Sequence, residues 1–180
     1  MSRAVPRKKP DAFCDMTVSR LTTDPLTQLP ILILKDASGD EALPIWIGLP
    51  EASAIAAELE HIAYERPLTH DLLKIVLGEA GMRVDSVEVT DVKNQTFFAA
   101  IYLRKPLSRK RVKIDSRPSD AIALAMRCGA PIRVARRVLD RARRIDLREP
   151  AEAPDSIEDT PELADILASL ADEDFGKWKM

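Results

Sequence analysis

The stretch that most constrains the fold is residues 112–125, Val-Lys-Ile-Asp-Ser-Arg-Pro-Ser-Asp-Ala-Ile-Ala-Leu-Ala. It predicts a strand that ends at Asp115, followed by an almost wholly apolar helix that begins near Pro118 and ends at Cys128. The junction holds two carboxylates, one arginine and two hydroxyls. Asp and Ser are typical of a helix N-terminus, where they cap backbone N–H groups. Polar side chains at a strand-to-helix corner are also typical of a functional site on a rigid frame, so both interpretations stay open from local chemistry.

Apolar runs on both sides of this corner predict further strands. We expect strands over residues 13–22, 29–34, 42–47, 84–92, 97–103, 112–114 and 131–134. Turn residues at 36–40 and 93–95 join four of these into two hairpins. Pro30 and Pro44 have no N–H to donate, so each should lie at a strand end or on an edge strand.

Apolar residues at helical spacing predict three helices. The first opens at Pro50 and has a core stripe that continues to Ala63, and the second is capped by Thr69 and has a stripe from Leu72 to Ala80. The third is the helix at the corner. Strands grouped in hairpins with helices between them predict an α+β fold with a mostly antiparallel sheet.

Charge is distributed unevenly along the chain. Residues 149–180 hold ten acidic residues and two lysines, which leaves 25 Lys and Arg against 19 Asp and Glu in residues 1–148. A basic body permits a polyanionic partner. No apolar run approaches the roughly 20 residues of a membrane helix, and no apolar segment follows the basic N-terminus, so we expect neither a membrane span nor a signal peptide. Cys14 and Cys128 predict free thiols in a reducing compartment, hence a cytoplasmic protein.

Two basic clusters are candidates for contacts with nucleic acid. Residues 104–113 hold six Lys and Arg, and residues 136–148 hold six arginines on a predicted amphipathic helix. Clustered cations bind phosphates without reading sequence. Aromatic residues make up 4% of the chain and none interleaves with these clusters, so no stacking platform is predicted. An equal alternative for the arginine helix is neutralisation by the acidic tail of its own chain.

Four blocks resemble one known family. They are Leu43–Gly48 (Leu-Pro-Ile-Trp-Ile-Gly), Arg66–Asp71 (Arg-Pro-Leu-Thr-His-Asp), Asp115–Ala125 and Gly129–Pro131. In this order and spacing the chain resembles the bifunctional nuclease (BFN) domain family. The resemblance implies an α+β domain, usually oligomeric, that occurs as a small bacterial protein and as a domain of plant proteins. It also implies nuclease activity on RNA and DNA.

The resemblance divides the chain into three parts. Residues 1–12 are expected to be a disordered basic arm and residues 13–140 the BFN-like domain. Residues 141–180 hold the rest of the basic helix and an acidic extension, with a proline-marked linker over 150–161 and a short helix over 161–170. We expect a homo-oligomer, most simply a dimer, because the apolar helix surfaces exceed what one small sheet needs.

The first candidate site is the corner itself. Asp115 and Asp120 flank Arg117, and carboxylates that share a rim can hold Mg²⁺ or Mn²⁺ for phosphodiester hydrolysis. Arg117 can hold a phosphate bidentately. The alternative is that Arg117 pairs internally with Asp115 or Asp120 and only locks the corner.

The second candidate site is His70 with Asp71. His70 can act as a general acid or base, oriented by Asp71 or Asp115, and the alternative is a surface histidine without a chemical role. Glu51 and Glu58 can add ligands, although their spacing favours a solvated helix face. The candidate nucleic-acid contacts are Arg66, Arg104, Lys105, Arg109, Lys110 and Arg111.

Two functions therefore follow from the sequence. The first is a non-specific nuclease of RNA and DNA, with a divalent cation as an optional cofactor. The second is a non-catalytic, oligomeric binding or scaffold domain that recognises an anionic ligand.

Overall fold

The computed structural model describes residues 12–106, 108 and 110–146. The expectations for the basic arm, the acidic linker and the short C-terminal helix fall on residues outside these ranges, apart from Ala12. The elements in chain order are β1 (Phe13–Thr23), β2 (Pro30–Asp36), β3 (Ala42–Trp46), α1 (Leu49–Leu59), α2 (Thr69–Glu79), β4 (Arg83–Lys93), β5 (Thr96–Arg104), β6 (Arg111–Ser116), α3 (Pro118–Cys128), β7 (Ile132–Ala135) and α4 (Arg136–Asp146). No helix among the described residues is both long and apolar enough to cross a membrane.

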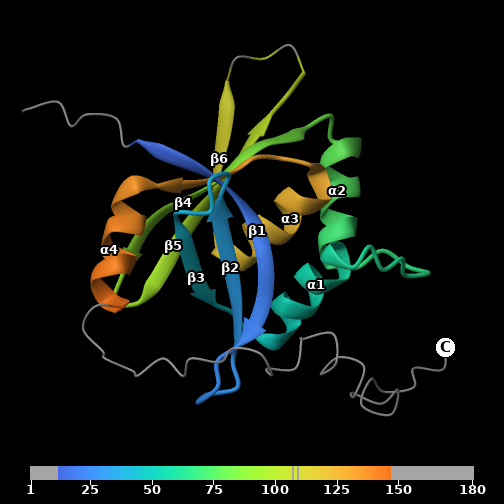
Figure 1. The fold of residues 1–180 in the computed structure, drawn as a ribbon. Coiled ribbons are helices and arrows are strands. Elements are labelled where there is room, and N and C mark those ends of the chain that lie inside the picture. Colours follow the sequence, from blue (N-terminus) through green and yellow to red (C-terminus); the bar gives the residue numbers. More distant parts are fainter. Residues whose placement is uncertain (1–11, 107, 109, 147–180) are drawn as a thin grey trace, which may run out of the picture.

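The strands form one seven-stranded mixed sheet in the order β3-β2-β1-β7-β4-β5-β6. Among the described strands, β4 and β7 make the one parallel pair, and every other pair is antiparallel. The α+β class and the antiparallel-rich sheet are thus confirmed. Within residues 12–146, apart from the two positions not described, the helices number four rather than three, because the arginine-rich helix α4 packs on β4 and β7 as part of the same body. Figure 1 shows α1, α2 and α3 gathered at one side of the sheet and α4 at the opposite side.

Both predicted hairpins are present. β2 pairs with β3, and the turn between them places Gly39 at φ 80°. β4 pairs with β5 through Asn94 and Gln95, both at positive φ, as a two-residue hairpin turn requires. The two prolines also lie where expected, since Pro30 begins β2 and Pro44 lies within the edge strand β3.

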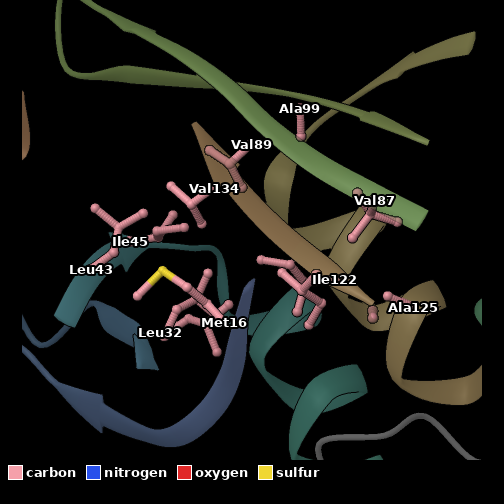
Figure 2. Packing of buried hydrophobic residues seen from close by; sticks show 14 of the residues in the cluster. Met16, Leu32, Leu43, Ile45, Val87, Val89, Ala99, Ile122, Ala125 and Val134 are labelled. Carbon is pink, nitrogen blue, oxygen red and sulfur yellow. The ribbon is translucent and has the colours of Figure 1, made fainter. Parts of the chain in front are cut away.

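The core surrounds α3. Ala121, Ile122, Ala123, Leu124 and Ala125 are all buried, so this helix is covered on nearly every side. Its small side chains allow the sheet and the neighbouring helices to approach closely. Figure 2 shows side chains from several strands converging on one face of the sheet beside this helix. The frame that carries the polar corner is therefore rigid.

Two helix predictions need correction. α1 ends at Leu59, before Ile62 and Ala63, because the chain turns out of the helix through His61 at φ 52°. The cap of α2 is Leu68, and Thr69 is already helical. The reason is that Asp71 accepts a hydrogen bond from the Leu68 N–H (2.9 Å), which satisfies that terminus.

The predicted core stripe of α2 is also wrong. None of its residues is buried, and Leu72, Leu73, Ile75 and Val76 are exposed. The helix packs on α3 rather than on the sheet, and Leu77 is its apolar residue that reaches the core cluster. Helical periodicity shows which face is apolar, but not whether the same chain covers that face.

Candidate functional site

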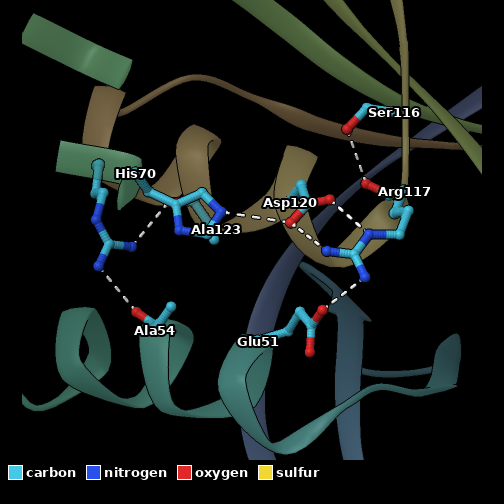
Figure 3. Close-up of polar contacts among 8 residues, drawn as sticks. Glu51, Ala54, His70, Ser116, Arg117, Asp120 and Ala123 are labelled. Atoms are coloured by element: carbon cyan, nitrogen blue, oxygen red, sulfur yellow. Dashed lines mark hydrogen bonds and ion pairs between the residues drawn. The ribbon is translucent and has the colours of Figure 1, made fainter. Parts of the chain in front are cut away.

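Arg117 lies at the centre of the polar corner. It is the N-cap of α3, with extended backbone (φ −69°, ψ 147°) before Pro118. Its Nε and Nη2 donate to the two carboxylate oxygens of Asp120 (2.7 and 3.0 Å), and its Nη1 lies 2.6 Å from Glu51 Oε1, as Figure 3 shows. These contacts use three of the five guanidinium N–H donors, and the side chain is 66% exposed. Two donors therefore face solvent from a fixed position.

Two carboxylates hold this arginine from different helices. The carboxylate of Asp120, and then that of Glu51, raises the pKa of Arg117 further above its ordinary value, so the group stays cationic. Asp120 belongs to the first turn of α3 and Glu51 to the first turn of α1. The corner is thus an electrostatic bridge between the N-termini of two helices.

Glu51 is the contact that the sequence interpretation missed. Its side chain is only 16% exposed, not solvated as expected. The carboxylate turns back over the start of α1, where a Cβ at Gly48 would overlap Glu51 Oε2. The available signal was local: Gly48 is the N-cap and Glu51 stands three residues after it, the spacing at which a glutamate reaches back to a helix start.

The structure also brings His70 to this corner. Its Nε2 lies 3.6 Å from Asp120 Oδ1, and its side chain is 13% exposed (Figure 3). This separation is that of an electrostatic contact, longer than a hydrogen bond. The sequence offered Asp71 or Asp115 as the carboxylate next to His70, whereas the structure places Asp120 there.

Asp71 takes part in a separate bridge, with Arg127. Arg127 Nε lies 2.6 Å from Asp71 Oδ1, and the guanidinium also donates to the carbonyls of Ala123 (3.1 Å) and Ala54 (3.0 Å). Burial alone would raise the pKa of Asp71, but the N–H donors of Arg127 and Leu68 outweigh it and lower that pKa. This bridge ties α1, α2 and α3 together next to the corner. The sequence clue was a single arginine near the end of an otherwise apolar helix.

Asp115 lies apart from the other carboxylates. It alternates with Ile114 along β6, so its side chain points to the opposite face of the sheet from the core. It is exposed and has no polar partner among the described residues. No cluster of three or more His, Cys, Asp or Glu suited to a metal ion occurs in the described part of the chain. The divalent cation at Asp115 and Asp120 stays a prediction.

The predicted nucleic-acid contacts fall into two groups. Arg104 and Arg111 both lie 2.9 Å from Asp85 on β4, and Arg111 also covers the Tyr102 ring. By contrast, Arg66, Lys105 and Lys110 are exposed and have no side-chain partner within the described residues. Arg109 lies outside those residues.

Arg66 lines a pocket of about 450 Å³. Tyr64, Asp71 and Arg127 line the same pocket, so this arginine lies on the Asp71–Arg127 side of the frame. It therefore shares a pocket with the Asp71–Arg127 bridge.

Three arginines of α4 have partners within the body. Arg136 Nη1 lies 2.6 Å from Glu41 Oε1, and Arg141 Nη1 lies 2.6 Å from Asp91 Oδ1. Arg137 donates to the carbonyl of Thr90 (2.8 Å). These contacts hold α4 against the ends of neighbouring strands. The sequence suggested either nucleic-acid binding or neutralisation by the acidic tail for this helix, and neither alternative included such a role.

Known proteins match most of the described part of the chain. Residues 32–146 match the family described as the bifunctional nuclease domain. An uncharacterized protein of Mycobacterium tuberculosis (strain H37Rv) is 35% identical over 149 residues, which cover 81% of this chain and 88% of that protein. Bifunctional nuclease 1 of Oryza sativa subsp. indica is 31% identical over 109 residues, which cover 60% of this chain and 33% of the rice protein. Bifunctional nuclease 2 of Arabidopsis thaliana is 32% identical over 105 residues, which cover 58% and 32%. The aligned part is thus about a third of each plant protein.

Proposed function

The chain belongs to the bifunctional nuclease domain family, and from this membership and the geometry of its corner we propose that it hydrolyses the phosphodiester bonds of RNA and DNA. The plant relatives are named bifunctional nucleases, but they share only a third of their length with this chain. The observation that carries the proposal is Arg117, a cation fixed by two carboxylates that keeps two N–H donors open to solvent.

Arg117 is the proposed phosphate-binding residue. Phosphodiester hydrolysis places extra negative charge on the phosphoryl oxygens in the transition state, and donors fixed in advance stabilise that charge without reorganising. Glu51 and Asp120 provide this fixation because each holds a different part of the guanidinium. A bound phosphate would accept from the two remaining N–H groups.

His70 is the proposed general acid or base. In its neutral form it can take a proton from the attacking water, and Asp120 then faces the imidazolium that results. The same imidazolium can return the proton to the leaving oxygen. An Asp next to a His stabilises the charged ring and fixes its orientation, which is the part proposed for Asp120. Asp71 holds Arg127 and supports the helix that carries His70.

Non-specific contacts are proposed for the exposed cations. Arg66, Lys105 and Lys110 are free to meet a phosphate backbone, and such contacts read no sequence. Arg104 and Arg111 are proposed to act mainly as partners of Asp85, with a weaker share in binding.

The described residues do not assemble a metal centre. Both oxygens of Asp120 already accept N–H groups from Arg117, and Asp115 points to the other face of the sheet. No step is therefore assigned to a cation. Mg²⁺ or Mn²⁺ at Asp115 and Asp120 remains a proposal, which titration of each metal into chelator-treated protein tests directly.

A second function, a non-catalytic scaffold that recognises an anionic ligand, is favoured by one observation. Two carboxylates face one guanidinium, and together they join the starts of α1 and α3. Such a bridge can serve the fold alone. We also propose that the protein is a homodimer, and a cytoplasmic location remains a prediction from its two free cysteines.

Cleavage by purified protein separates the two functions. The full chain is fractionated by size, and each fraction is assayed on RNA and DNA for the wild type and for Asp120→Ala. The nuclease proposal expects activity to follow the protein peak and to disappear in Asp120→Ala while the circular dichroism spectrum and the molecular mass persist. Activity that elutes apart from the protein, or that survives in Asp120→Ala, contradicts it. A wild type that cleaves nothing, together with an Asp120→Ala variant that melts or dissociates, supports the scaffold.

A further inference from the structure

The pocket that Arg66 lines lies between the end of α1, the connection over residues 60–68 and the first two turns of α2. Figure 1 shows this connection extending outward from the two helices. Arg127, which is 3% exposed, forms the inner wall of the pocket, and the exposed residues Tyr64 and Arg66 form its outer wall. Its volume of about 450 Å³ is within the range of about 300–1,000 Å³ that is typical of sites for small molecules.

Two neighbouring residues of α2 connect this pocket to the corner. His70 faces the corner, where its Nε2 lies 3.6 Å from Asp120 Oδ1 (Figure 3), and the next residue, Asp71, lines the pocket. Asp120 in turn lies 2.7 Å from the Nε of Arg117. Since consecutive Cα atoms are about 3.8 Å apart, the pocket begins directly beside the proposed general acid or base.

We propose that this pocket receives one base of the nucleic-acid strand whose phosphate is bound at Arg117. The inference rests on the proposed nuclease function and adds the class of substrate to it. That class is a single strand, because a base that is paired and stacked in a duplex cannot enter a pocket. A duplex meets only the exposed cations outside the pocket. Single-stranded RNA and DNA are therefore the preferred substrates.

The lining of the pocket suits a base, which has two apolar faces and a polar edge. Tyr64 is 54% exposed and Ile62 is 51% exposed, so both offer surface to a flat ring. An exposed aromatic ring stacks with any base, because every base has a π-face. The charged lining residues are three cations and three carboxylates, namely Arg66, Lys74, Arg127, Glu58, Glu65 and Asp71. Because these charges balance, an uncharged ring with a polar edge fits the pocket better than a free anion.

Arg66 has a different task at the same pocket. It is exposed and has no side-chain partner among the described residues, so its N–H donors are available. A guanidinium beside a stacked base is placed to meet the next phosphate of the strand. Tyr64 and Arg66 thus combine an aromatic ring with a cation, which is typical of single-strand binding. The basic clusters over 104–113 and 136–148 contain no aromatic residue and cannot provide this combination.

Titration with mononucleotides tests the pocket without any cleavage. AMP, GMP, CMP and UMP contain no phosphodiester bond, and ribose 5-phosphate has the same kind of phosphate and sugar without a base. Dissociation constants are measured by NMR titration of the full-length protein. We expect each nucleotide to bind at least about tenfold more tightly than ribose 5-phosphate. This advantage should disappear in Tyr64→Ala and persist in Tyr64→Phe, which keeps the ring.

Trp46→Ala is the matched control for this titration. Trp46 is 48% exposed and does not line the pocket, so its loss should leave all of these dissociation constants unchanged. Tyr64 is also largely exposed, so Tyr64→Ala should keep the wild-type melting temperature. Equal affinity of the wild type for the nucleotides and for ribose 5-phosphate overturns the proposed pocket. A full nucleotide advantage in folded Tyr64→Ala overturns it as well.

Cleavage kinetics separate the pocket from the nuclease function on which it rests. Initial rates over a range of substrate concentrations are compared for a single strand and for the same strand in a duplex. We expect the wild type to prefer the single strand. Tyr64→Ala should raise KM for that strand more than it lowers kcat, since Tyr64 holds the base and takes no part in proton transfer.

The two proposals fail in different ways. A wild type that cleaves single strand and duplex alike, or a Tyr64→Ala variant with an unchanged KM, overturns the pocket and leaves the nuclease function intact. A wild type that cleaves neither substrate overturns the nuclease function. In that case the nucleotide titration alone decides whether the pocket binds a base.

Discussion

The Glu51 carboxylate occupies the space that a side chain at Gly48 would fill, and from there it reaches Arg117 (Oε1 to Nη1, 2.6 Å). Gly48 has ordinary extended backbone angles (φ −77°, ψ 160°), so its missing Cβ provides room for the Glu51 carboxylate rather than conformational freedom. The block Leu43–Gly48 and the corner at Arg117 are far apart in the sequence, and this contact joins them.

Gly48→Ala should weaken the corner without altering any charge. The backbone accepts alanine, so the fold persists, but the new Cβ displaces the carboxylate from Arg117. Because Arg117 is largely exposed, we expect the lost pair to cost less than about 1 kcal/mol of unfolding free energy. The measurement is urea denaturation of Gly48→Ala, Glu51→Ala and the double variant. Gly48→Ala should cost less in the Glu51→Ala background, and an equal cost in both backgrounds would show that the two residues are not coupled.

Arg127 should contribute more to stability than any exposed arginine. It is 3% exposed and donates to Asp71, Ala54 and Ala123, so Arg127→Met removes one buried donor group from all three of these acceptors. We expect a loss of at least about 2 kcal/mol of unfolding free energy. Arg127→Lys should recover only part of this loss, because one ammonium cannot reproduce the planar fork.

Arg133→Met is the matched control for that variant. Arg133 pairs with Asp15 on the surface, and its loss should cost no more than about 0.5 kcal/mol. Similar losses for Arg127→Met and Arg133→Met in chemical denaturation would contradict the bridging role of Arg127.

The Asp71–Arg127 bridge should also make stability depend on pH. The pKa of Asp71 is lowered in the folded protein, below the value of about 3.9 in an unfolded chain. Its contribution to stability is therefore complete above about pH 4 and is lost as the pH falls through the folded pKa. The melting temperature of the wild type should fall more steeply below pH 4 than that of Asp71→Asn. Parallel curves for the two proteins would remove Asp71 from this role.

The exposed lysines of the β5–β6 connection should contribute to nucleic-acid binding more than its paired arginines. Lys105→Ala with Lys110→Ala should lower the affinity for duplex DNA and reduce the slope of log affinity against log salt by up to about 2. Arg104→Ala should leave that slope unchanged and lower the unfolding free energy by about 1 kcal/mol, because Asp85 loses a partner. Fluorescence anisotropy over a salt series measures the affinity and its slope, and urea denaturation measures the unfolding free energy. A larger change of slope for Arg104→Ala than for the double lysine variant would show that the paired arginine, and not the two lysines, contacts the phosphates.

Much of the fold could be predicted because it depends on local pattern. The hairpin turns, the prolines at strand ends and edges, and the limits of α3 from Pro118 to Cys128 all follow from backbone chemistry over a few residues. Exposure of the apolar face of α2 could not be predicted, because it depends on where the helix packs. The end of α1 was missed because apolar residues continue past the point where His61 turns the chain.

The candidate site was also predictable only in part, because part of it depends on how the helices pack. Arg117 and Asp120 are close in sequence, so their pairing was one of the two alternatives considered. His70 and Glu51 reach the corner from α2 and α1. Distances between different helices cannot be derived from the spacing of residues in the sequence. Asp115 and Asp120 looked equivalent in the sequence, yet strand alternation sends Asp115 to the other face.

The most direct test of the central proposal is the cleavage rate of Arg117→Ala. Initial rates on RNA and DNA are compared for the wild type, Arg117→Ala and the control Arg133→Ala, with melting temperatures recorded on the same samples. If Arg117 stabilises the transition-state phosphate, its removal should slow cleavage about 100-fold or more while the fold persists, and Arg133→Ala should cleave at the wild-type rate. Cleavage by folded Arg117→Ala at the wild-type rate would contradict the proposed site.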